Sequence, residues 1–131
     1  MQTNYICPFC NGHLNVNDNI VLIVRNSAKQ QGLVFLHTEI GNYSSQMNSS
    51  LDIKKGETVD FFCPYCHTNL EYHKDESSLV KIQHEDVQGK KSQVVFSKIY
   101  GEERTYHIHE DKVLSYGEHA KHFQDPEWFL K

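Results

Sequence analysis

The chain has 131 residues, of which 38% are hydrophobic and 23% charged. Leu, Ile, Val and Phe make up about a quarter of it, above the roughly 20% below which disorder is expected. We therefore expect a single folded domain over residues 1–131. The formal net charge of −4 disfavours a nucleic acid as partner, because such domains neutralise phosphates with a basic surface. No apolar run approaches the ~18 residues of a membrane span.

The first six residues lack the basic and apolar segments of a secretory signal, so we expect a cytoplasmic protein that does not contact a membrane. Residues 1–74 read as a part built around cysteine pairs, with a long inserted hairpin. After the first pair, the apolar run Ile20–Val24 predicts a buried strand, and the β-branched segment Leu33–Ile40 predicts its partner. Gly41–Ser50 is polar and of low complexity, and we expect it to be mobile. Leu51–Ile53 and Thr58–Phe62 are predicted to form a hairpin that leads into the second cysteine pair.

Residues 75–131 predict an antiparallel meander. The turns are short, and short connections force neighbouring strands to run antiparallel. At most short helices are expected, the first within Gly117–Gln124. Asp125-Pro126-Glu127 has the signals of a last helical turn, which would carry Trp128, Phe129 and Leu130 to close one face of the sheet. The predicted strands are Leu79–His84, Gln93–Tyr100, Arg104–His109 and Lys112–Tyr116.

The four cysteines form two matching pairs, Cys7-Pro8-Phe9-Cys10 and Cys63-Pro64-Tyr65-Cys66. Two residues between cysteines let one tight turn direct both sulfurs at a single ion, and the proline fixes φ in that turn. Two such turns facing each other form the four-sulfur cage that zinc prefers in structural sites. We predict one structural zinc ion per chain. Its ligands are Cys7, Cys10, Cys63 and Cys66.

The surroundings of the two pairs also match, with an aromatic and a bulky apolar residue before each pair and a leucine four positions after it. Over Tyr5–Leu14 and Phe61–Leu70 the chain resembles the knuckles of zinc-ribbon and rubredoxin-like proteins. The resemblance implies a metal site but no particular function, since zinc ribbons occur in transcription, translation, enzyme and adaptor proteins. The 52 residues between Cys10 and Cys63 far exceed the ~15–20 of compact sites. The knuckles are therefore expected to bracket an insertion, and they can meet within one chain or across two.

Other uses of the cysteines are less favoured. Disulfides need an oxidising compartment, and iron in rubredoxin-like sites uses the same four sulfurs but in smaller and more acidic proteins. The second pair also matches the glutaredoxin active-site motif, so a thiol redox protein is an alternative. That fold needs a later cis-proline, and the chain offers only Pro8, Pro64 and Pro126. Two matching pairs favour one shared ion.

Nine histidines raise the question of a second metal site. His107 and His109 are two apart on a predicted strand, and His119 and His122 are three apart at helical spacing, so either pair has the geometry of a chelating pair. No acidic cluster completes a site, and the phosphate-binding and nucleophile motifs are missing. We expect a non-catalytic binding, adaptor or regulatory module with a protein partner rather than an enzyme. A nucleic-acid-associated zinc-ribbon protein is the alternative.

Overall fold

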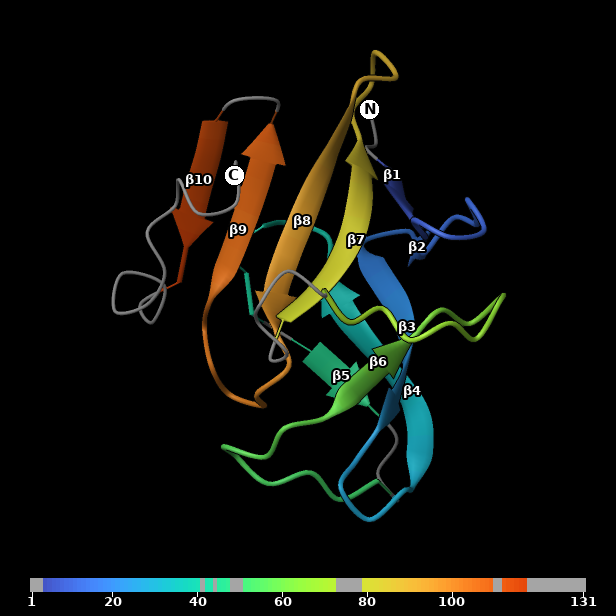
Figure 1. Ribbon diagram of the computed structural model, residues 1–131, viewed down its shortest axis with the longest axis vertical. Helices are drawn as coiled ribbons and strands as arrows, with labels where there is room; N and C mark the ends of the chain where they lie inside the picture. The colour runs from blue at the N-terminus through green and yellow to red at the C-terminus, as the bar shows by residue number, and fades with distance from the viewer. Residues whose placement is uncertain are drawn as a thin grey trace.

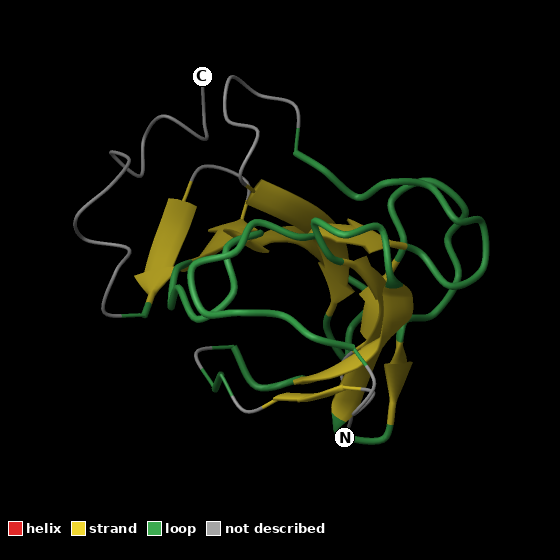
Figure 2. Ribbon diagram, turned by 90° about the horizontal axis from the view of Figure 1, so that it is seen from below, coloured by secondary structure: helices red, strands yellow, loops and turns green. Residues whose placement is uncertain are grey.

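The computed structural model describes residues 4–40, 42–43, 45–47, 51–72, 79–109 and 112–117, and these contain strands and loops but no helix (Figure 2). Accordingly, no helix in these ranges has the length and apolar character needed to cross a membrane. All strand pairings are antiparallel. The first sheet has the order β1 (Asn4–Ile6), β7 (Leu79–Glu85), β8 (Lys91–Ser97), β9 (Thr105–His109) and β10 (Lys112–Tyr116). The second has the order β2 (Asn15–Val16), β3 (Asn19–Arg25), β4 (Gln31–His37) and β5 (Ser45–Met47), and β6 (Asp60–Phe62) also pairs with β3.

The main hydrophobic core lies between the two sheets, which occupy the upper and lower parts of Figure 1. Alternate residues of β3 and β7 point into it, because successive side chains of a strand face opposite sides. Leu22 of β3 and Ile82 of β7 are both fully buried there. The expected mainly β, antiparallel class is confirmed, including the meander β7–β8–β9–β10.

The two halves of the chain have the same local topology and exchange one strand each. β1 leads into the first cysteine pair and is followed by the hairpin β3–β4, while β6 leads into the second pair and is followed by the hairpin β7–β8. Each leading strand pairs with the hairpin of the other half. Tyr5 lies opposite His84, and at the equivalent place Phe61 lies opposite Val24. The repeat seen in sequence around the cysteines thus extends over both hairpins.

The two hairpin turns repeat the same hydrogen bonds. Asn26 Oδ1 accepts from the backbone N–H groups of Ala28 and Gln30, and Asp86 Oδ1 accepts from those of Gln88 and Lys90. These are Asx turns, in which a short side chain replaces a backbone acceptor. The Asn26 amide also donates to the Asp52 carbonyl at 3.0 Å. The equivalence of Asn26 and Asp86 sets both hairpins in the same register.

An ion network around one buried lysine joins the two sheets. Lys98, just after β8, is 5% exposed, and its Nζ lies 2.7 Å from Asp60 Oδ1 of β6 and 2.9 Å from Glu71 Oε1. Arg25 of β3 reaches the other oxygen of Asp60 at 3.6 Å. Burial works to lower the pKa of Lys98, but the two carboxylates outweigh it and raise that pKa. The ammonium therefore stays charged inside the structure.

The structure differs from the sequence expectations at two places between the cysteine pairs. Gly41–Ser50 contains a strand that the sequence did not predict, β5, which pairs with β4 so that Ser45 lies opposite Leu36; the mobility of the segment stays a prediction. The hairpin of Leu51–Ile53 with Thr58–Phe62 is wrong, because β6 pairs with β3 instead and Leu51–Ile53 is not a strand. β3 is a seven-residue, mostly apolar strand, so it is a longer pairing partner for β6 than the three residues 51–53 would be. The expected helix and aromatic segment after residue 117 lie outside the described residues.

Candidate metal centre

The first cysteine pair forms a tight turn at the end of β1. Cys7 is buried and Cys10 is exposed. The N–H of Phe9 points at Cys7 Sγ, 3.4 Å away, and the N–H of Asn11 donates to the Cys7 carbonyl. Asn11 has a φ of 64°, a left-handed conformation that asparagine tolerates better than most residues. The turn thereby places both sulfurs on one side of the backbone.

The second pair repeats this turn at the end of β6. Cys63 is buried and Cys66 exposed, the N–H of Tyr65 lies 3.3 Å from Cys63 Sγ, and the N–H of His67 donates to the Cys63 carbonyl. His67, with a φ of 60°, occupies the place of Asn11. His67 is exposed. Its part in the site is to let the backbone close the turn.

The strand exchange brings the two turns together within one chain. The ligand atoms of all four cysteines lie within 4.8 Å of one another. Across the pairs, Cys7 Sγ is 3.8 Å from Cys66 Sγ and Cys10 Sγ is 3.7 Å from Cys63 Sγ. Zinc–sulfur bonds of about 2.3 Å in a tetrahedron place sulfurs roughly 3.8 Å apart. A disulfide would need about 2.05 Å, so the spacing fits a shared metal ion and not two disulfides.

The thiols have pKa values that differ according to burial. Burial raises the pKa of Cys7 to about 12 and also raises that of Cys63, against the lowering effect of the turn N–H groups. In contrast, the hydroxyl and backbone of Thr68 lower the pKa of Cys66 to about 6, with the hydroxyl 3.2 Å from its sulfur. A divalent cation favours the thiolate form. The buried pair is thus the part of the site that depends most on a cation to ionise.

Gly12 and Thr68 occupy equivalent positions after the two knuckles, and the structure explains why they differ. A Cβ atom on Gly12 would lie 2.6 Å from the ring of Tyr65, so the glycine allows the aromatic ring of one knuckle to lie over the other. Thr68 instead supplies a hydroxyl to Cys66. The glycine thus permits a contact between the knuckles, and the threonine makes a contact within the second one.

The histidines predicted as a possible second site form a different arrangement. His107 and His109 share a face of β9, as expected, with ring centroids 3.9 Å apart, and His84 of β7 joins them. The Ser92 hydroxyl lies 2.8 Å from His107 Nε2 and 3.3 Å from His84 Nδ1. Burial, together with the charges of His109 and His84, lowers the pKa of His107 to about 4.

In the described part of the chain, the four cysteines are the sole group of three or more metal-ligating side chains whose ligand atoms converge. The described histidines therefore do not bring three metal-ligating atoms together at one point. His119 and His122 lie outside the described residues. Sequence reasoning did not predict that His84 and Ser92 would join this cluster. The two residues lie opposite each other in the β7–β8 hairpin, and the short turn between the two strands was the feature of the sequence that could have indicated this pairing.

Four thiolates fill the coordination shell of a tetrahedral metal ion and leave no open position for a substrate. Such a site can hold chain segments together, but it cannot activate a water molecule. No protein-family model, curated protein or solved structure matches the chain. The class that fold and site define is therefore limited to a mainly β protein with a four-cysteine cluster at metal-binding distance.

Proposed function

We propose that the chain binds one zinc ion through Cys7, Cys10, Cys63 and Cys66, and that this zinc is structural. The observation that carries the proposal is the convergence of all four sulfurs within 4.8 Å. The two distances across the pairs, 3.8 Å and 3.7 Å, match the edge of a zinc–sulfur tetrahedron. The resemblance of both knuckles to zinc-ribbon proteins supports the same ion. Iron would use the same sulfurs, and metal analysis distinguishes the two.

The zinc joins the start of the chain to its middle, one knuckle from each half. Because the ligands converge only in the folded chain, the free energy of metal binding stabilises the fold, with apparent values of ~10–16 kcal/mol in small zinc peptides. Here the sheet core shares that role, since fully buried side chains from both halves pack together. We therefore expect the metal-free chain to be weakened rather than fully unfolded.

The proposed biological role is that of a non-catalytic binding, adaptor or regulatory module in the cytoplasm, with another protein as partner. Two exposed aromatic side chains at the knuckle tips support a protein partner: Phe9 is 56% and Tyr65 is 63% exposed. Exposed aromatic rings are enriched where proteins bind each other. The net charge of −4, about −6 once four thiolates hold a zinc ion, disfavours nucleic acid. If no protein–nucleic acid complex forms in a gel-shift assay at low salt, that alternative is excluded.

The zinc proposal is tested by native mass spectrometry with a count of free thiols under denaturing conditions. We expect one zinc ion and four thiols per chain. In Cys63→Ser, zinc content should be lost and the free energy of unfolding should fall by at least about 3 kcal/mol, or about 10 °C in Tm. Phe9→Ser is the matched control on the knuckle surface and should keep its zinc.

Two outcomes would contradict the proposal. A Cys63→Ser variant that loses zinc but keeps full stability would show that the metal is not structural. A metal-free protein with two disulfides would favour the thiol redox alternative, for which the exposed Cys66, with its pKa of about 6, would be the reactive thiol.

A further inference from the structure

The two sheets do not close completely over the core, and a cavity of about 430 Å³ remains between them. Five apolar side chains that pack against the main core are only partly buried, and all five line this cavity. They are Leu36, Ile40, Met47, Ile53 and Phe96. The partly buried apolar side chains at the edge of the main core thus meet in one cavity.

The cavity is open to solvent on one side, so its apolar side chains contact water when it holds no ligand. Removing apolar surface from water is favourable, by roughly 25 cal/mol for each Å² buried. Ligand pockets, by contrast, have volumes of about 300–1,000 Å³ and mostly apolar walls with few polar groups. The cavity therefore has the properties of a small-molecule site.

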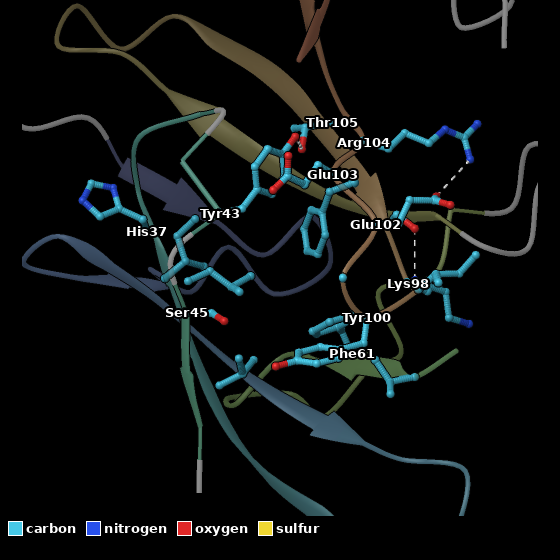
Figure 3. Close-up of a pocket in the computed structure, with 18 of the residues that line it drawn as sticks. His37, Tyr43, Ser45, Phe61, Lys98, Tyr100, Glu102, Glu103, Arg104 and Thr105 are labelled. Atoms are coloured by element: carbon cyan, nitrogen blue, oxygen red, sulfur yellow. Dashed lines mark hydrogen bonds and ion pairs between the residues drawn. The ribbon is translucent and has the colours of Figure 1, made fainter. Parts of the chain in front are cut away.

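At one side of the cavity, Tyr43 of the second sheet is hydrogen-bonded to the first sheet. Tyr43, after β4, lies with its hydroxyl 2.9 Å from Thr105 Oγ1 of β9 (Figure 3). The same hydroxyl donates to the Tyr116 carbonyl at 3.2 Å. Gly117, with a φ of 95°, leaves room for this contact, because a Cβ there would meet the Tyr43 hydroxyl at 2.5 Å and the Glu103 carbonyl. The opening is thus held by hydrogen bonds before any ligand arrives, which lowers the cost of binding.

The charges around the cavity balance. Its lining includes three basic and three acidic side chains. Lys98 is already neutralised by Asp60 and Glu71, and Arg104 faces Glu102 at 3.9 Å. No net field favours an anion or a cation. The charged lining residues are Lys55, Lys98, Arg104, Glu39, Glu102 and Glu103.

The lining also includes uncharged polar side chains, among them that of Ser45. Ser45 of β5 points into the space (Figure 3), on the same face as Met47, and its hydroxyl forms no hydrogen bond with the described part of the chain. A peptide segment would bring backbone N–H and C=O groups that such walls leave unpaired. A compact molecule with one or two hydrogen-bonding atoms would not.

We propose that this cavity between the two sheets binds a small, uncharged, mainly apolar molecule with one hydrogen-bonding group. A cavity of about 150 Å³ holds one benzene ring, so the volume here suits a molecule of about two or three rings, or an aliphatic chain of similar volume. The site is separate from the cysteine cluster, since no cysteine lines it. The inference thus goes beyond the proposed zinc function and does not depend on it.

The test uses N-phenyl-1-naphthylamine, an uncharged aromatic probe whose fluorescence rises in apolar surroundings, and its anionic relative 8-anilino-1-naphthalenesulfonate, which adds a sulfonate to the same rings. The full chain is titrated after its metal content and circular dichroism have been recorded. We expect saturable binding of one uncharged probe per chain, and binding of the anionic probe at least about tenfold weaker, since burying its charge without a partner is unfavourable.

Two substitutions in the same strand locate the probe. Leu36→Trp fills the cavity and should weaken binding at least about tenfold, whereas Leu33→Trp places the same ring on the exposed side of β4 and should change it by less than about twofold. Met47→Trp of β5 is the second cavity-filling variant if Leu36→Trp does not fold. The proposal is overturned if the folded chain shows no saturable binding, if the filled variants bind as well as the parent, or if the anionic probe binds equally well.

Discussion

Replacing Lys98 by methionine tests whether the ion network around it holds the two sheets together. Methionine keeps much of the apolar stem but removes an ammonium whose Nζ lies 2.7 Å from Asp60 and 2.9 Å from Glu71. A hydrogen bond to a charged group contributes about 1.5–3 kcal/mol. The side chains of Asp60 and Glu71 are 32% and 23% exposed, so water screens both interactions and the values must be discounted. Methionine also recovers the cost of burying the ammonium.

We therefore expect Lys98→Met to lower the free energy of unfolding by about 2 kcal/mol at pH 7, as measured by urea unfolding of the metal-loaded chain. Lys91→Met, at the exposed first position of β8, is the matched control and should change it by less than about 0.5 kcal/mol. In a double-mutant cycle with Asp60→Asn, the two effects should be less than additive because the residues share one interaction.

The pH dependence gives an independent check on this network. Burial works to raise the pKa of Asp60, but Lys98 and Arg25 outweigh it and hold that pKa below its usual range. A carboxyl with a lowered pKa contributes stability above its unfolded pKa of about 3.9, and that stability is lost as pH falls through the folded value. The difference between the parent and Lys98→Met should therefore shrink below about pH 4. Equal stability of the two proteins at pH 7, or strict additivity in the cycle, would refute the role assigned to Lys98.

Two further predictions concern the histidine cluster and the hairpin turns. The pKa of His107 is about 4, below the unfolded value of about 6.5, so the folded chain binds fewer protons and loses stability as pH falls between these values. From pH 7 to pH 5 the parent should lose about 2 kcal/mol more than His107→Gln; parallel urea-unfolding profiles would contradict this. Asn26→Ala should cost about 2 kcal/mol and Asp86→Ala about 1 kcal/mol, because the buried Asn26 also holds Asp52. Equal losses for the two turns would contradict that distinction.

The sequence was most informative where a residue's chemistry is local. Proline and cysteine at fixed spacing predicted both knuckles, and the strand predicted over Leu79–His84 is confirmed as β7. Neither inference required knowledge of which segments meet. The four cysteines could be grouped for the same reason, because two identical pairs left few other ways to build a four-sulfur site.

What sequence reasoning missed depends on long-range pairing. β6 pairs with β3 and not with its neighbour in the chain, and a three-residue strand carries no pattern that names its partner. The larger repeat was hidden because the hairpins share turn geometry rather than residue identity, with Asn26 in one and Asp86 in the other. The cavity was also out of reach, since its walls come from both sheets and depend on how far apart they pack.

The exchange of β1 and β6 between the halves has a consequence for assembly. The β1–β7 ladder, the β3–β6 ladder and the four-cysteine cluster each join a segment of the first half to a segment of the second. Two chains that traded their first halves would therefore keep the same ladders and the same two four-sulfur cages, with each cage shared between chains. Domain swapping would require a rearrangement of the segment between β5 and β6, where the Asp52 carbonyl accepts from the Asn26 amide, and it would cost the entropy of association.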